Sequence, residues 1–123
     1  MDIRSTLTAL CAAFNAHDLD RIMSYFADDC VLVMPRGNKP WGSRFDGKAN
    51  VRAALATRFE GLPDVHYGEE QHFVDEAAGT GMSKWMLTGT TRQGAKIEVH
   101  GCDFYTFRDG SVIRKDSYWK IVE

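Results

Sequence analysis

Apolar positions in the first half of the chain follow a helical spacing. Ile3, Leu7, Leu10 and Phe14 recur every three or four residues, which predicts an amphipathic helix over residues 2–15. Most of the later apolar positions follow a different pattern, described below, so the helices are expected to come first.

Two more helices and one short strand are predicted before the chain changes character. Asp18 is a good N-cap for a short second helix. An apolar run over residues 30–34 ends at a proline and reads as a strand. A third helix is expected to run from residue 46 to residue 60, because Gly61 and Pro63 follow it in the order typical of a helix end.

The loop over residues 36–46 carries large side chains among glycine and proline. Trp41 and Phe45 lie in it, and bulky residues in a loop are typical of a lid or the rim of a pocket. Met34, just before this loop, is a flexible apolar residue that suits a core or a pocket wall.

The second half of the chain reads as an antiparallel meander. Gly81, Gly89 and Gly101 fall inside long strands, where glycine lets a sheet bend or bulge. We therefore expect an α+β domain in which a strongly curved sheet wraps around three N-terminal helices and encloses a cone-shaped interior. The four predicted strands cover residues 65–75, 80–91, 95–107 and 111–122.

Asp103 is the residue that says most about function, because it interrupts a strand that otherwise enters the core. Aspartate is depleted in strands and is rarely buried without a partner. A three-residue hairpin loop would pair Phe107 with Ser111 and set Asp103 opposite Lys115. A two-residue loop would instead set Asp103 against Asp116, and like charges opposite each other are unfavourable. The first register predicts a carboxylate–ammonium pair on a mostly apolar sheet face.

Strand alternation places further side chains beside Asp103. If residues 92–94 form a three-residue loop, Trp85 lies over Gly101; with a two-residue turn, Lys84 would face Asp103 instead. The predicted pocket-lining residues are Met34, Trp41, Trp85, Tyr105, Ser117 and Trp119, with Asp103 and Lys115 as the catalytic candidates.

The opposite sheet face is also partly apolar, around Cys102, Phe104 and Tyr118. A partly apolar outer face predicts that another surface covers it, most simply a second copy of the chain in a homodimer packed sheet to sheet.

Composition narrows the class of protein. A chain of 123 residues is long enough for one domain with a full core, and it is expected to be a single domain over 1–123. The formal net charge of −2 with mixed signs and no basic stripe argues against nucleic acid as a partner. No apolar run approaches the roughly 20 residues of a membrane span, and no signal peptide is evident. Three widely spaced cysteines indicate reduced thiols in a cytoplasmic protein, with no metal site.

Several stretches resemble SnoaL-like domains of the nuclear transport factor 2-like superfamily. The resemblance rests on residues 14–31, on Phe45-Asp46-Gly47-Lys48 before a helix, and on Phe107-Arg108-Asp109-Gly110 before the Tyr118-Trp119 strand. It covers nearly the whole chain and implies a cystatin-like α+β barrel. It leaves the activity open, because this fold hosts isomerases, polyketide cyclases, epoxide hydrolases, dehydratases and binding proteins.

Ketosteroid isomerase is the most useful relative for comparing mechanisms. The resemblance places Asp103 at that family's oxyanion-hole aspartate and Trp119 at a pocket-lining tryptophan. The family's general base falls on Met34 and its oxyanion tyrosine on Leu10, so two of its three catalytic groups are missing here. This argues against steroid isomerisation.

Two functions remain open on the sequence. The chain could bind a small apolar carbonyl or hydroxyl compound and isomerise, cyclise or dehydrate it by cofactor-free proton transfer, with Asp103 as base or anchor and Lys115 setting its charge. It could instead be a non-catalytic ligand-binding or dimerisation module whose cavity is filled by its own side chains.

Overall fold

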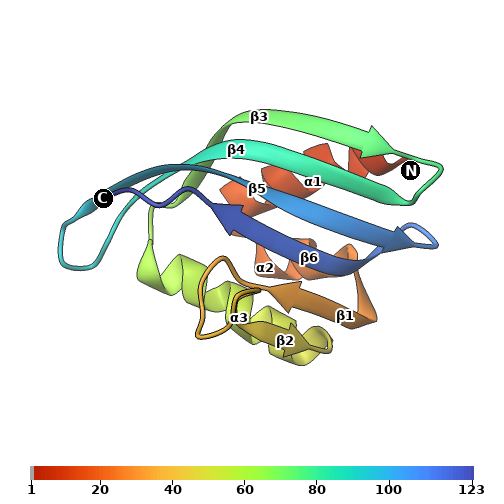
Figure 1. Ribbon diagram of the computed structural model, residues 1–123, viewed down its shortest axis with the longest axis horizontal. Coiled ribbons are helices and arrows are strands. Elements are labelled where there is room, and N and C mark those ends of the chain that lie inside the picture. The colour runs from red at the N-terminus through yellow and green to blue at the C-terminus, as the bar shows by residue number, and fades with distance from the viewer. Residues whose placement is uncertain (1) are drawn as a thin grey trace.

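The computed structural model describes residues 2–123, and three helices precede most of a six-stranded sheet (Figure 1). The predicted α+β class is therefore confirmed. The helices are α1 (Ile3–Asn15), α2 (Leu19–Ser24) and α3 (Lys48–Gly61). The strands are β1 (Phe26–Val33), β2 (Arg44–Asp46), β3 (His66–Asp75), β4 (Thr80–Thr90), β5 (Lys96–Arg108) and β6 (Ser111–Trp119).

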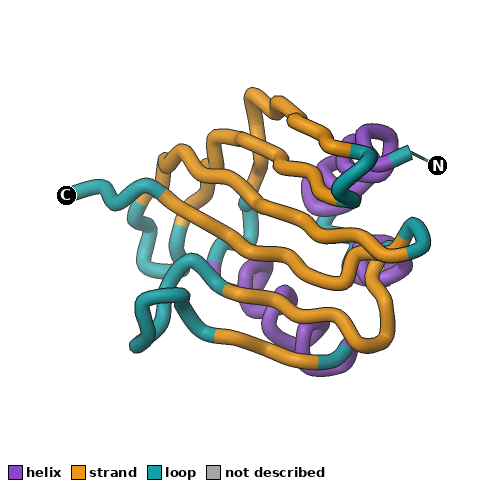
Figure 2. Tube along the Cα trace, turned by 45° about the vertical axis from the view of Figure 1, so that its right-hand side comes forward, coloured by secondary structure: helices purple, strands orange, loops and turns teal. Residues whose placement is uncertain are grey.

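The sheet is curved but does not close on itself. Its strand order is β2-β1-β6-β5-β4-β3, so β2 and β3 form its two edges. The meander from β3 to β6 is antiparallel, as expected, whereas β1 joins it parallel to β6. The short strand β2 forms within the segment that was predicted to be a loop. All three helices lie on one side of the sheet (Figure 2).

Local sequence signals set the first two helices as predicted. The Asp2 carboxylate accepts from the backbone N–H of Ser5 at 2.7 Å, and Asp18 accepts from that of Arg21 at 3.1 Å, so both helices begin at a capping aspartate.

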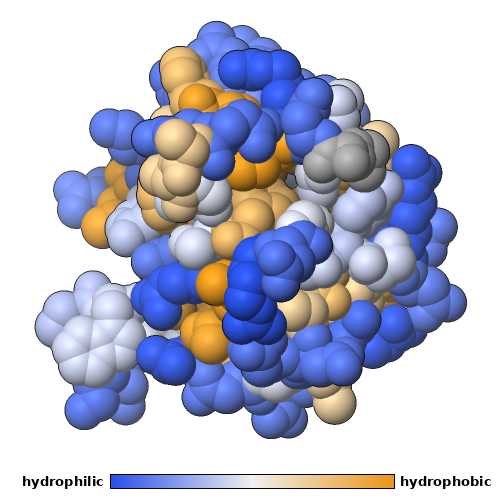
Figure 3. Space-filling model, turned by 90° about the vertical axis from the view of Figure 1, so that its right-hand side faces the viewer, coloured by the Kyte–Doolittle hydropathy of each residue, from blue (hydrophilic) through white to orange (hydrophobic). Residues whose placement is uncertain are grey.

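The apolar face of α1 packs against the sheet and forms much of the core. Polar side chains cover most of the end of the molecule seen in Figure 3. The largest fully buried side chains include Leu7, Leu10, Ile22, Leu32, Val51 and Leu87.

The hairpin between β5 and β6 differs from the predicted register. Asp103 lies opposite Ser117, not opposite Lys115, and Tyr105 is the cross-strand partner of Lys115. The turn has two residues, Asp109 and Gly110, both with positive φ, as in a type I′ turn.

A β-bulge explains why this error left the faces unchanged. The register shifts between Thr106, which pairs with Arg114, and Phe107, which pairs with Val112. One extra residue in β6 follows the shorter turn, so the pairing moves by two positions in all. Because side chains alternate with a period of two, Asp103 and Lys115 still share the inner face.

The other predicted hairpin register is confirmed. Trp85 pairs with Gly101, as a three-residue loop at residues 92–94 requires. Its indole ring lies over the glycine, since a β-carbon at position 101 would come within 2.7 Å of the Trp85 ring. A glycine at 101 therefore lets the indole ring approach the inner sheet face closely.

Replacing Gly101 by alanine should destabilise the fold. The new methyl group would meet the Trp85 ring and the backbone oxygen of Tyr118, so we expect a loss of about 1–3 kcal/mol in unfolding free energy, typical of overpacking. Gly61→Ala is the matched control, because a β-carbon there meets no atom within 4 Å; its unfolding free energy should change by less than about 1 kcal/mol. Urea unfolding measures both. Equal stability of the two variants would contradict the packing of Trp85 over Gly101.

Candidate functional site

Asp103 is the centre of a buried polar cluster built from three strands. Its Oδ1 accepts from Lys115 Nζ at 3.0 Å and from Ser117 Oγ at 2.5 Å, and its Oδ2 accepts from Trp85 Nε1 at 3.0 Å. Lys115 also donates to Ser117 Oγ at 2.8 Å. Asp103 and Lys115 are each only 5% exposed, so the structure brings the two catalytic candidates together inside the core.

The hydrogen bonds leave one position open on the carboxylate. Each carboxylate oxygen can accept about two hydrogen bonds. Oδ1 already takes two donors, from Lys115 and Ser117, whereas Oδ2 takes one, from Trp85. A proton or a ligand donor approaching Asp103 would therefore be received at Oδ2.

Lys115 is held over an aromatic ring as well as over the carboxylate. Its Nζ lies 5.4 Å from the centroid of the Phe14 ring, within cation–π range. The ammonium is thus compensated by an ion pair, a hydroxyl and a π-face, which together offset its removal from water.

Two small cavities border Asp103 between α1, α3 and the sheet. Each has a volume of about 10 Å³, enough for roughly one water molecule. Phe14, Tyr67 and Trp85 line both of them. The first also contacts Leu7, Cys11, Ser83 and Tyr105, and the second also contacts Met34, Ala54, Leu55, Arg58, Lys115, Ser117 and Trp119. The cone is therefore almost filled by its own side chains.

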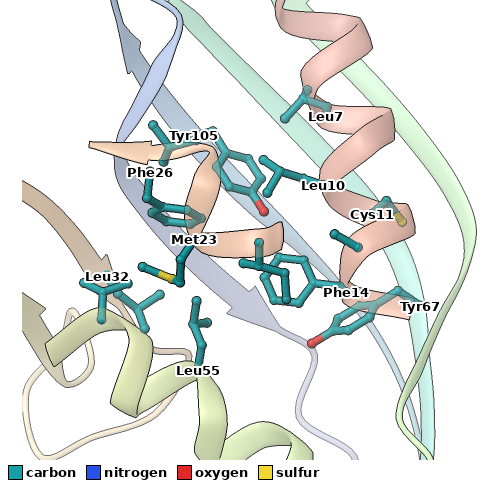
Figure 4. Close-up of a cluster of buried hydrophobic side chains, with 14 of the residues drawn as sticks. Leu7, Leu10, Cys11, Phe14, Met23, Phe26, Leu32, Leu55, Tyr67 and Tyr105 are labelled. Atoms are coloured by element: carbon teal, nitrogen blue, oxygen red, sulfur yellow. The ribbon is translucent and has the colours of Figure 1, made fainter. Parts of the chain in front are cut away.

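Two tyrosine hydroxyls face this interior (Figure 4). Burial raises the pKa of Tyr67, the Asp103 charge raises it further, and the Arg58 guanidinium lowers it in part. Burial and Asp103 likewise raise the pKa of Tyr105 well above its ordinary value. Both phenols consequently stay protonated at neutral pH and can act as hydrogen-bond donors.

The structure places five of the six predicted lining residues at these cavities. Met34, Trp85, Ser117 and Trp119 border the second cavity, and Tyr105 borders the first. Trp41 is a correction: it is 61% exposed and lines neither of the two cavities beside Asp103. The turn that carries it projects from the β1–β2 connection, a direction that loop composition does not encode.

Arg58 and Tyr67 are cavity residues that the sequence reasoning missed, and Arg58 is the charged one. It is half-buried on α3, and its guanidinium carbon lies 4.4 Å from the centroid of the Trp119 ring. A signal was present, because Val51, Ala54, Leu55 and Arg58 share one helical stripe and three of the four are apolar. A charged residue on the core-facing side of a helix indicates that this side borders a pocket.

A row of polar side chains also crosses the inner sheet face. His72, Ser83, Asp103 and Ser117 are successive cross-strand neighbours on β3, β4, β5 and β6. His72 Nδ1 lies 2.9 Å from Ser83 Oγ, and its Nε2 lies 2.8 Å from Glu70 Oε2. Ser83 is thus already hydrogen-bonded on its β3 side, and the row keeps buried polar atoms satisfied.

Other kinds of site find no support in residues 2–123. No three His, Cys, Asp or Glu side chains gather there closely enough to hold a metal ion. No helix in the same range is long and apolar enough to cross a membrane. The three thiols are free, and burial raises the pKa of Cys11 to about 12, so this thiol stays protonated at neutral pH.

Comparison with known proteins identifies the family. The model of the SnoaL-like domain matches residues 7–115, and the chain belongs to this family. No curated protein sequence matches the chain. The curved sheet with helices on one face is therefore the SnoaL-like fold, with Asp103 and Lys115 in its interior.

Solved structures with the same fold come from proteins of low sequence identity. A provisionally assigned polyketide cyclase of Pseudomonas putida KT2440 is 17% identical with a TM-score of 0.88, over 98% of this chain and 93% of the other. A provisionally assigned isomerase of Bacillus subtilis is 16% identical with a TM-score of 0.80, over 94% and 84%. TerC, co-crystallised with polyporic acid, is 20% identical with a TM-score of 0.78, over 94% and 89%.

Removing the Lys115 charge should destabilise the protein strongly. Lys115→Met leaves the buried Asp103 carboxylate without its counter-ion, so the unfolding free energy should fall by about 3–5 kcal/mol in urea unfolding. Adding Asp103→Asn removes the stranded charge and should recover part of the loss. Lys96→Met, on an exposed residue, should change stability by less than about 0.5 kcal/mol. A Lys115→Met variant as stable as this control would show that the pair does not stabilise the core.

Proposed function

We propose that this protein binds a small, largely apolar carbonyl or hydroxyl compound and catalyses proton transfer on it without a cofactor, as an isomerase or a cyclase-like lyase. One observation carries the proposal: the Asp103 carboxylate is held on the inner sheet face by three donors and keeps one acceptor position free beside a cavity. The polyketide cyclase and isomerase assignments of fold neighbours, and the polyporic acid co-crystallised with TerC, support a small organic ligand.

The chemistry needs only groups of the chain. Asp103 Oδ2 would take a proton from the carbon next to a carbonyl, which breaks the C–H bond and leaves an enolate. The Tyr67 hydroxyl and the Lys115 ammonium are the donors that would stabilise the enolate oxygen. Return of the same proton to another carbon completes an isomerisation, and no oxidant or reductant is consumed.

The donor set differs from that of ketosteroid isomerase. By the sequence resemblance, Leu10 and Met34 fall at the positions of its oxyanion tyrosine and its base, and Leu10 is buried in the core. Tyr67 enters the interior from β3 instead, and its ring lies 5.7 Å from that of Phe14. The proposed base is therefore Asp103 itself, with a tyrosine from a different element as donor.

The filled interior favours the alternative function. Trp85 packs edge to face against Tyr67 and Trp119, at centroid distances of 5.0 and 6.3 Å, and only water-sized cavities remain. A non-catalytic dimerisation module whose cone is filled by its own side chains would need no larger space. An enzyme or a ligand-binding module, by contrast, requires cavity-lining side chains such as Trp119 to move aside and admit a ligand.

A hydrogen–deuterium exchange screen separates these two functions. In D₂O, the wild-type protein should incorporate deuterium next to the carbonyl of at least one member of a panel of small cyclic ketones, detected by mass spectrometry. Asp103→Asn should lower that rate by about 10²–10⁴-fold, the usual contribution of a general base. Asp109→Asn is the matched control, because this exposed turn residue has a φ of 52°, which asparagine tolerates.

Two results would count against the enzyme. Exchange that persists in a folded Asp103→Asn variant would remove Asp103 from the reaction. A wild-type protein that exchanges no ketone of the panel faster than buffer would favour the non-catalytic module.

We also propose that a second copy of the chain covers the outer sheet face, in a cytoplasmic homodimer. Phe73, Phe104 and Tyr118 are 52%, 43% and 57% exposed there. Next to Phe104, which pairs with Met82, lies a shallow hollow of about 240 Å³ whose wall includes Met82 and Cys102. In a two-fold interface the same patch of each copy contacts the other. The patch must therefore carry both a projecting side chain and a hollow that receives the same side chain of the partner, and this face has both.

The oligomeric state tests this second proposal directly. Sedimentation equilibrium should give twice the mass of one chain for the wild type, and Phe104→Lys should shift it to a single chain. Ile121→Lys, on the exposed C-terminal segment, is the control and should leave the mass unchanged. Phe107→Lys would not serve, because Phe107 packs against the core. Monomeric wild type at high micromolar concentration would overturn the dimer.

A further inference from the structure

Arg58 is a positive charge at the cavity wall that forms no salt bridge within residues 2–123. Arg52, on the same helix, shows the ordinary arrangement: it is exposed and pairs with Asp20. Arg58 is half-buried and points inward instead, so its placement needs another explanation.

The charges around the second cavity do not cancel. Lys115 and Asp103 neutralise each other at 3.0 Å, which leaves the Arg58 guanidinium as the excess charge. The aromatic face of Trp119, 4.4 Å from the guanidinium carbon, compensates it in part. A cation–π contact occupies the flat face of a guanidinium and leaves its N–H donors, which lie in the plane, available for hydrogen bonds. One of these donors is directed at the Tyr67 hydroxyl, and the fork retains further donors for a ligand.

Arg58 also acts on the Tyr67 hydroxyl, one of the two donors proposed for the enolate oxygen. It lowers the pKa of Tyr67, which burial and Asp103 raise. Both side chains border the same cavity as Met34, Leu55 and Trp119, so the wall combines an apolar surface with a forked cationic donor and a phenol. Arginine in such a setting recognises planar anions such as carboxylates, because the fork can bind both oxygens.

We infer that Arg58 is a specificity-determining residue that selects a ligand with an apolar body and an anionic group, a carboxylate or an ionised enol. The inference rests on the proposed function, because it concerns the ligand of the same cavity. The apolar body would replace Trp119 side-chain contacts in the cone, and the anionic group would stay at the guanidinium, near the surface. The reactive carbonyl would then lie deeper, toward Asp103.

A matched pair of probes isolates the charge. 2-Naphthoate and 2-naphthamide share an aromatic body and differ in charge at pH 7, because a carboxyl group with an ordinary pKa near 4 is ionised there. Titration calorimetry gives both affinities, and ¹⁵N shifts of the three tryptophan indoles locate the binding. Trp85 and Trp119 should shift, whereas the exposed Trp41 should not.

The wild type should bind 2-naphthoate at least tenfold more tightly than 2-naphthamide. Arg58→Gln should bring that ratio close to one without weakening 2-naphthamide, Arg58→Lys should retain part of it, and Arg52→Gln should leave it unchanged. A basic residue that served only the C-terminal end of α3 would not alter this ratio.

The outcomes separate the inference from the proposed function. Equal binding of both probes, with shifts at Trp85, would overturn the anionic ligand class and leave a small-molecule pocket. A preference for 2-naphthoate that survives Arg58→Gln would assign the selectivity elsewhere. Failure of both probes to bind or to shift Trp85 would count against the pocket itself.

Discussion

The buried charge of Asp103 is the constraint on which the inner architecture depends. A carboxylate in an apolar core is tolerated only when donors surround it, and here they come from three places: Lys115, Ser117 and Trp85. Each donor has a geometric requirement of its own. The indole must approach Gly101 closely, and the bulge in β6 must bring Ser117 opposite the carboxylate. Sheet register and core packing are thus tied to a single buried carboxyl group.

The sequence reasoning found the right face but the wrong partner within it. Alternation along a strand fixes which side chains share a face, so Asp103 and Lys115 were expected together, and they are. A bulge changes the cross-strand register without disturbing that alternation over the rest of the strand. The residues around Thr106 carry no sequence signal that predicts a bulge there. The long lysine side chain spans the resulting diagonal, which is why the ion pair forms despite the shifted register.

Other differences have similar local causes. Trp41 was assigned to a pocket from loop composition, which says nothing about the direction a turn takes, and it points to solvent. Arg58 was not predicted as a cavity residue because the apolar side chains on its face of α3 define the core-facing side. The one charged residue on that face is the informative one. Tyr67 enters the interior beside Asp103 through β3, a placement that depends on tertiary packing.

The position of β6 has a consequence for how the chain folds during synthesis. This strand is the last of the six sheet strands in chain order, yet it lies between β1 and β5 and supplies both Lys115 and Ser117. A nascent chain that ends before β6 holds Asp103 without its ammonium partner, and it leaves β1 paired with β2 alone. Long-range pairing of this kind slows folding and concentrates cooperativity in one late step. We therefore expect the sheet to become complete only after β6 has left the ribosome.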